Sequence, residues 1–247
     1  VFYSFPDEFT DRWDFALKYV ENFLRWYAGF HLRRLEIISG SEILRHELTD
    51  FIKSEMDVSP GLAGALNIFR GLLIQDVTIP EEMALMLPRI VSDRDDSTIV
   101  MFLDEFQNTH LPHHNFRVVG YMQQAVESPT CPHFVTGSAM TILSKEILGR
   151  GALFGRFDSD PIRPLSEYWG AQLARRAAAY YHAEVPEIMS PSVASRCGGN
   201  PFYITAVVRQ AAKQGQSIDN ETALNRMLAV DLSSGFIWAE LNDQVSR

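Results

Sequence analysis

Two adjacent carboxylates, Asp104 and Glu105, are the residues of this chain best suited to chemistry. They follow an apolar run, Ile99 to Leu103, which predicts a strand buried on both faces, as in a parallel sheet. Open α/β sheets bind their ligands at the carboxyl ends of the strands. At such a place an aspartate would hold Mg²⁺, directly or through water, and a glutamate would polarise an attacking water. The structural alternative is an acidic turn that merely ends the strand.

A second group of candidate ligands contains His110, His113 and His114. Pro112 interrupts their spacing, no helix would place two of them four residues apart, and no thiolate stands nearby. The two cysteines, Cys131 and Cys197, are far apart in sequence and offer neither a disulfide framework nor zinc-ligand spacing. The sequence therefore predicts no transition-metal site.

The composition places the 247-residue chain among ordinary globular proteins, with 46% hydrophobic and 21% charged residues. The formal charge of −9 argues against a broad basic face for nucleic acid. The absence of a disulfide framework favours a reducing, cytoplasmic location. No uncharged apolar run approaches the roughly 18 residues of a transmembrane helix, so we expect no membrane span.

Strand and helix signals alternate in the first two thirds of the chain. Strands are expected at Val1 to Phe5, at Ile99 to Leu103, at Pro132 to Ser138 and near 160–165. Helices are expected from Asp7 or Thr10 to Gly29, after a Ser41 cap, over 62–74, from Pro80, over 116–127 and over 140–148. The 33–38 segment reads as a strand or as a turn of helix. The aromatic residues of the first helix recur at helical spacing, which favours core packing over a base-stacking surface.

After Leu165 the strand signals disappear. Ser166 is expected to cap a long helix, and three further helices follow near 186–196, over 202–214 up to Gly215, and from Asp219. The sequence thus predicts an α/β part over 1–165 with a parallel sheet flanked by helices, a small helical part over 166–230, and a further C-terminal segment over 231–247.

Four short motifs, taken in order, resemble a known family. Ile99 to Glu105 looks like a Walker B strand, and Phe134 to Ser138 looks like a sensor-1 strand. The Gly155-Arg156 pair looks like the arginine segment before a last strand, and Gly198 to Pro201 looks like the Gly-x-Pro turn of a lid. Their order and spacing resemble the STAND branch of the AAA+ P-loop ATPases, and in particular the archaeal-type ATPase group, over nearly the whole chain.

The resemblance implies a P-loop-NTPase-like sheet, a helical lid and an ATP-binding, ATP-hydrolysing switch. Asp104 would hold Mg²⁺ and Glu105 would position the attacking water. The resemblance also implies nucleotide contacts in both parts of the chain, which would come from Thr136 and Ser138 of the α/β part and from Gly199 and Pro201 of the lid.

Arg156 takes the position of an arginine finger that reaches a neighbouring subunit's nucleotide, which implies self-association. The structural alternatives are an ordinary loop arginine for Arg156 and a plain helix start for Asn200-Pro201.

One departure from the family is large. A P-loop needs Gly-x-x-x-x-Gly-Lys-Ser/Thr, and this chain has no Gly-Lys dipeptide; its lysines are Lys18, Lys53, Lys145 and Lys213. We expect the P-loop upstream of Val1, and most of the winged helix that follows such a lid downstream of Arg247.

Three functions compete on this basis. The first is the ATP-driven switch, incomplete as printed, and the second is a scaffold or interaction module that retains the fold without nucleotide chemistry. The third is a nucleic-acid-associated ATPase, to which the net charge lends no support.

Overall fold

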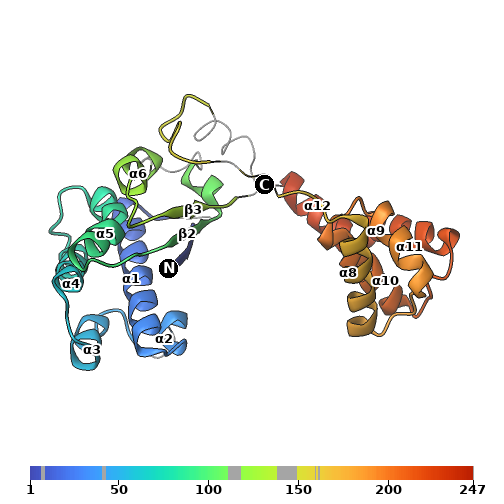
Figure 1. Ribbon diagram of the computed structural model, residues 1–247, viewed down its shortest axis with the longest axis horizontal. Coiled ribbons are helices and arrows are strands. Elements are labelled where there is room, and N and C mark those ends of the chain that lie inside the picture. Colours follow the sequence, from blue (N-terminus) through green and yellow to red (C-terminus); the bar gives the residue numbers. More distant parts are fainter. Residues whose placement is uncertain are drawn as a thin grey trace. The chain divides into compact units, whose positions relative to one another are not determined.

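The computed structural model describes residues 1–6, 9–40, 43–110, 118–137, 149–158, 160 and 162–246 (Figure 1). The chain divides into two compact units, Val1–Ser159 and Asp160–Arg247. Each unit has its own hydrophobic core, and each is described here by itself.

The N-terminal unit contains a small parallel sheet. Its strands β1 (Phe2–Ser4), β2 (Met101–Asp104) and β3 (His133–Val135) lie in the order β1-β2-β3. The expected parallel α/β arrangement is thereby confirmed for the described residues, in the coarser form of a mostly helical unit around three short strands. No strand forms at the described residues of the expected 160–165 strand, so that prediction is wrong for them.

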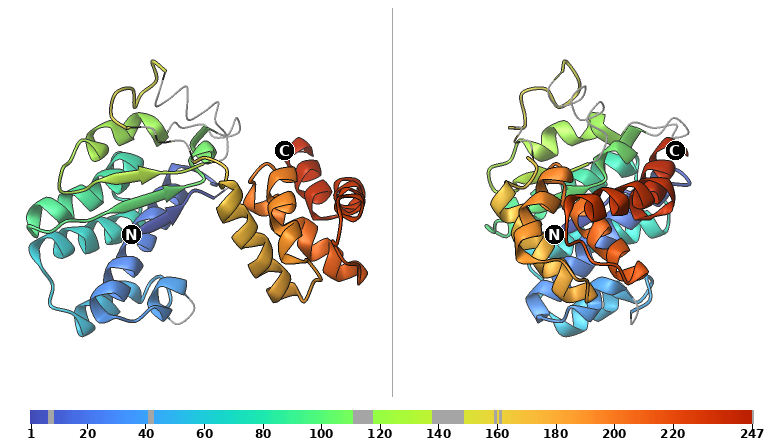
Figure 2. Two further views of the ribbon diagram at one scale, coloured as in Figure 1. Left: turned by 45° about the vertical axis from the view of Figure 1, so that its right-hand side comes forward. Right: turned by 90° about the vertical axis from the view of Figure 1, so that its right-hand side faces the viewer.

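Helices connect the strands. Between β1 and β2 the chain forms α1 (Arg12–Leu32), α2 (Glu36–Ser39), α3 (Leu48–Glu55), α4 (Pro60–Leu73) and α5 (Pro80–Arg94). Between β2 and β3 it forms the 3₁₀ helix η1 (Phe106–His110) and α6 (Val118–Val126). Both connections step across the sheet in the same direction, so right-handed crossovers put their helices on one face. Helix α5 packs between α1 and α6 on that face (Figure 2).

The prediction that the β2 strand is buried on both faces is wrong. Met101 and Leu103 point into the core, whereas the intervening Phe102 is 47% exposed. The physical reason is that the described helices of this unit pack on one side of the sheet, where they cover alternate residues of each strand.

Helix α1 supplies the aromatic part of the core. Asp11 caps it by accepting hydrogen bonds from the backbone N–H groups of Trp13 and Asp14. The rings of Phe15 and Tyr19 lie against Phe5 and Tyr3 of the first strand region, with centroids 6.2 and 4.9 Å apart. The helical spacing of these aromatics therefore reflects core packing, as expected.

The helix expected directly after Ser41 is wrong for the described residues, because α3 begins only at Leu48 and is preceded by Glu47, which makes no side-chain cap. Ser41 itself lies outside the described residues, as does the helix expected over 140–148. The 33–38 segment leads into the single helical turn of α2. The proline-started helix at Pro80 is confirmed.

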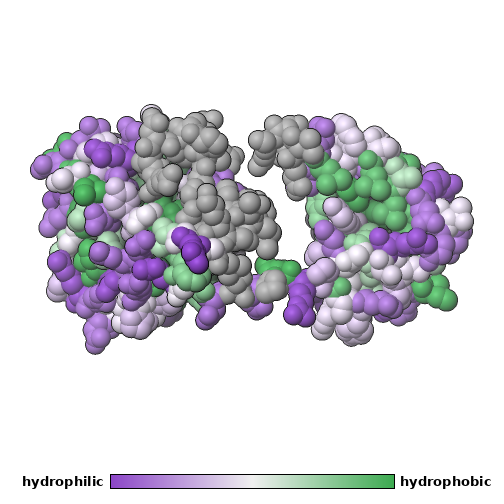
Figure 3. Space-filling view, turned by 90° about the horizontal axis from the view of Figure 1, so that it is seen from above, coloured by the Kyte–Doolittle hydropathy of each residue, from purple (hydrophilic) through white to green (hydrophobic). Residues whose placement is uncertain are grey.

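All regular structure in the described residues of the C-terminal unit is helical. It comprises α8 (Glu167–Tyr181), η3 (Glu187–Met189), α9 (Ser190–Arg196), α10 (Pro201–Gln214), α11 (Glu221–Ser234) and α12 (Phe236–Ser246). The Ser166 cap and the Gly215 stop are both confirmed. Helix α11 continues through residue 231, where a separate C-terminal segment was expected to begin. Hydrophobic side chains gather on one face of this unit (Figure 3). None of the described helices is long and apolar enough to cross a bilayer.

Candidate functional site

The two carboxylates lie where the β2 strand ends. Asp104 is the last residue of β2, and Glu105 follows with φ +54°, in the left-handed region that non-glycine residues seldom occupy. Such a conformation costs about 1–3 kcal/mol and tends to occur at functional sites. Because the backbone turns at Glu105, the two side chains do not alternate as they would within a continuing strand.

Asp104 belongs to a polar row that crosses the sheet. Ser4 pairs with Asp104 in the β1–β2 register, and Thr136 directly follows Val135, the partner of Leu103. The Thr136 hydroxyl donates a hydrogen bond of 2.5 Å to Asp104 Oδ1, and the Thr136 N–H donates to the Leu103 carbonyl. An aspartate between two hydroxyl side chains offers oxygen atoms of the kind that Mg²⁺ prefers.

Glu105 has a different partner. Gln107, on the first turn of η1, donates a hydrogen bond from Nε2 to Glu105 Oε2. A Cβ built at Gly137 would lie 2.6 Å from Gln107 Oε1, so the glutamine amide is seated against the backbone that follows β3. The Gln107 side chain therefore bonds Glu105, and the loop after β3 packs against the Gln107 amide.

The ends of the three strands are tied together around these residues. The Phe5 N–H donates to the Asp104 carbonyl, and the buried Asn108 donates from Nδ2 to the Phe5 carbonyl over 2.9 Å. The Phe106 N–H donates to the Thr136 carbonyl. Sequence reasoning missed Ser4, Gln107 and Asn108. A position at a strand end beside the carboxylates was the signal for Ser4, and closeness in sequence to Glu105 was the signal for the other two.

A row of phenylalanines lies beside the polar row on the same face. Phe2, Phe102 and Phe134 pair across β1, β2 and β3, and they are 42%, 47% and 55% exposed. The rings of Phe102 and Phe134 are stacked, with centroids 5.1 Å apart. We call this set the phenylalanine row. It is an apolar surface that the described helices, which pack on the opposite face, leave open.

The opposite face of β3 carries a histidine that stays neutral at physiological pH. Burial lowers the pKa of His133 to about 4, and its Nδ1 lies 2.8 Å from the Cys131 carbonyl oxygen. Burial likewise raises the pKa of the Cys131 thiol to about 12. These groups support the sheet and do not face the polar row.

Arg156 is engaged within its own unit. Its Nε lies 2.8 Å from Glu127 Oε1, and Nη1 donates to the carbonyls of Ala152 and Phe154 over 3.4 Å. The side chain is 29% exposed, so it lies partly at the surface.

Gly199 and Pro201 lie in the C-terminal unit at the start of α10. Pro201 is the first residue of the helix, and Asn200 caps it by accepting from the Phe202 and Tyr203 N–H groups. Gly199 has φ +69°, and a Cβ there would lie 2.2 Å from the Leu165 carbonyl oxygen. A close backbone approach thus accounts for this glycine without a ligand.

The remaining predicted site residue, Ser138, lies outside the described residues, as do His113 and His114. Within the described part of the chain, no three His, Cys, Asp or Glu side chains gather as a metal cage. A magnesium ion bound through one carboxylate, hydroxyls, water and substrate phosphates does not need such a cage.

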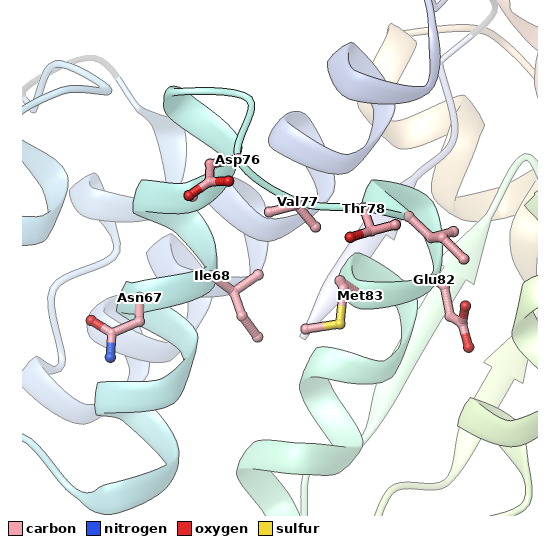
Figure 4. A pocket seen from close by; sticks show the side chains of 9 residues that line it. Asn67, Ile68, Asp76, Val77, Thr78, Glu82 and Met83 are labelled. Carbon is pink, nitrogen blue, oxygen red and sulfur yellow. The ribbon is translucent and has the colours of Figure 1, made fainter.

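A separate shallow pocket of about 560 Å³ lies between α4 and α5. Ile68 and Met83 point toward each other across it, and Asp76 and Glu82 lie at its margins (Figure 4). None of the strand-end residues lines this pocket, and it lacks a buried polar group directed at a ligand. The candidate site is therefore the carboxyl end of the sheet.

The comparisons with known proteins add no assignment: no family model matches the chain, and no curated protein or solved structure matches it significantly.

Proposed function

We propose that this chain carries the magnesium- and water-binding side of an ATP-driven switch of the STAND/AAA+ type. The observation that supports the proposal best is the polar row at the carboxyl end of a parallel sheet, with Asp104 between Ser4 and Thr136 and the strained Glu105 beside it. This is the edge at which open α/β sheets bind ligands.

Each residue has a distinct chemical task in this proposal. Asp104 anchors Mg²⁺ directly or through water, and the Thr136 hydroxyl orients its carboxylate. Glu105 positions the water that attacks the γ-phosphate of ATP. Ser138 is the proposed nucleotide contact in the same unit.

Hydrolysis also requires a phosphate cradle, which the printed sequence does not contain. In the proposal a P-loop and its following helix are supplied from outside residues 1–247. The open phenylalanine row is consistent with this, because both faces of a parallel sheet are normally covered by helices.

Arg156 acts toward a neighbouring subunit in this proposal. Its contact with Glu127 is a partly exposed ion pair, and such pairs are worth only about 0–1 kcal/mol. Glu127 therefore holds the guanidinium weakly enough for it to exchange partners when a nucleotide of a second subunit approaches.

The test compares carboxamide variants in the complete protein. Glu105→Gln is expected to keep ATP binding and to reduce turnover by about 10²- to 10⁴-fold, the usual effect of losing a positioned acid–base group. Asp104→Asn is expected to weaken Mg²⁺-dependent binding as well. Asp76→Asn, on the α4–α5 connection, is the matched control and should change neither. Unchanged turnover in Glu105→Gln would refute the assignment.

Residues 1–247 by themselves are expected to bind ATP weakly or not at all. The cradle supplies several charge-assisted hydrogen bonds, each worth roughly 1.5–3 kcal/mol. Isothermal calorimetry on this chain measures the effect, and micromolar affinity would contradict it.

The second candidate is an interaction module without nucleotide chemistry, and the phenylalanine row is the observation that favours it. A complete protein that contains a P-loop but neither binds nor hydrolyses ATP would support this candidate. Nucleic-acid association is the third candidate, and the charge of −9 gives it no support.

A further inference from the structure

Two adjacent residues after β3, Thr136 and Gly137, help to position both Asp104 and Glu105. Thr136 bonds Asp104 directly, whereas Gly137 contacts Glu105 only through Gln107. We propose that Gln107 is a positioning residue for the Glu105 carboxylate and that Gly137 is its seat, so that the Thr136–Gly137 segment sets both carboxylates together. This inference rests on the function proposed above.

The hydrogen bond between Gln107 and Glu105 has a defined direction. Gln107 donates from Nε2 to Glu105 Oε2, so the amide engages one carboxylate oxygen and leaves Oε1 for another partner. A carboxamide cannot take up a proton from Glu105 in the way that a second carboxylate would share one. It therefore orients Glu105 without replacing it chemically.

The η1 turn that carries Gln107 is itself held in place by hydrogen bonds. The turn is bonded to the residues that follow both edge strands. Asn108 donates to the Phe5 carbonyl after β1, and the Phe106 N–H donates to the Thr136 carbonyl after β3. The hydroxyl of Thr109 also donates to the Phe106 carbonyl within the turn. These bonds fix the backbone of the turn, so the Gln107 side chain reaches Glu105 from a defined position.

The Gln107 amide packs closely against Gly137. An added Cβ would lie 2.6 Å from Gln107 Oε1 and 3.3 Å from the Phe106 nitrogen. Atoms cannot approach this closely, so the Gln107 amide or the loop would have to shift. Since the Gln107 amide is the far end of a flexible side chain, we expect it to move aside and the Gln107–Glu105 bond to change.

Movement of the loop after β3 would regulate the proposed site. The loop after β3 would lie beside the γ-phosphate, and any displacement of it would move Thr136 and Gly137 together. The metal-holding and water-positioning carboxylates would then be displaced in one event. Misplacement of a reacting group by about 1 Å can cost as much as 10²-fold in rate.

The structural arm of the test uses the NMR signals of the Gln107 side-chain NH₂ group in residues 1–247. Glu105→Ala and Gly137→Ala are both expected to shift these signals. Gly120→Ala is the matched control, because a Cβ at Gly120 meets no atom within 4 Å. Gln107 signals that stay in place in Glu105→Ala and Gly137→Ala would overturn the proposal, whatever the protein does with ATP.

The kinetic arm uses the complete protein. Gln107→Leu is expected to lower kcat about 10- to 100-fold with little change in KM for ATP, and Gln107→Asn, which keeps the amide on a shorter side chain, should recover part of the loss. Gln214→Leu, at an exposed position of α10, is the control. If Glu105→Gln abolishes turnover but Gln107→Leu leaves kcat unchanged, the positioning role is wrong while the proposed function stands. If Glu105→Gln has no effect, the proposed function fails, and with it the role of Gln107 in hydrolysis.

Discussion

The two carboxylates at the end of β2 differ in how they are held. Asp104 is the end of a regular strand and bonds a hydroxyl of the neighbouring strand, whereas Glu105 sits in a left-handed conformation and bonds a glutamine two residues ahead. Neighbouring groups in distinct surroundings can take distinct chemical roles, as the proposed division between metal binding and water positioning requires.

His133 makes the stability of the N-terminal unit depend on pH. Its pKa is about 4 when folded, against an ordinary value of 6.5, so the unfolded chain takes up the proton first as the pH falls. The free energy of unfolding linked to His133 is therefore constant above about pH 6.5 and falls between pH 6.5 and 4. Protonation of this group lowers it by at most about 3 kcal/mol. Urea midpoints across this range should show the slope.

The His133→Asn variant is expected to flatten that slope, because asparagine has no proton to gain. The control is His46→Asn, at an exposed position. A slope that His133→Asn leaves intact would assign the acid sensitivity to other groups.

The two thiols are expected to be unreactive in the folded protein. Burial raises the pKa of both Cys131 and Cys197 to about 12, so almost no thiolate exists at pH 8. A chromogenic disulfide reagent should react with neither in buffer and with both in denaturing urea. Rapid labelling of either thiol in the native protein would show that the unit around it opens readily.

At the scale of elements, backbone contacts decide how the C-terminal unit begins. The Leu165 N–H donates to the Gly199 carbonyl, and a Cβ added at Gly199 would lie 2.2 Å from the Leu165 carbonyl oxygen. The segment before α8 is thereby fastened to the turn before α10. Two consecutive glycines with positive φ form that turn, but only the second is in close contact.

This difference predicts unequal effects of two adjacent substitutions. Gly198→Ala should cost about 1–2 kcal/mol, the penalty of a left-handed alanine, because a Cβ there meets no atom within 4 Å. Gly199→Ala should cost more than about 3 kcal/mol, because it adds a collision with Leu165 to the same penalty. Chemical denaturation of both variants compares them directly, and equal costs would contradict the proposed close contact.

At the scale of the whole molecule, the two units have separate cores. Met101 is buried within the core of the first unit and Met227 within that of the second. Since a unit with its own core can unfold by itself, a cavity in one should spare the other.

Met101→Ala and Met227→Ala are therefore each expected to destabilise one unit by about 2–5 kcal/mol. Amide hydrogen exchange resolves the two units, and protection should fall only in the unit that carries the substitution. Loss of protection in both units from either variant would show that they unfold together.

The sequence by itself determined the local features. The apolar run before Asp104, the cap at Ser166, the proline starts at Pro80 and Pro201 and the stop at Gly215 all act within a few residues, and the structure contains each of them. Local signals failed after Ser41, where the expected helix begins only at Leu48.

Only the tertiary structure decided which residues from other segments these features contact. Thr136 reaches Asp104 from 32 positions away, and the amide of Gln107 rests on Gly137, because strand register and the turns after β2 and β3 bring them together. The exposure of Phe102 reflects the packing of this unit's described helices on the other face. Periodicity describes one segment at a time, whereas these contacts depend on the pairing of segments, which no single segment encodes.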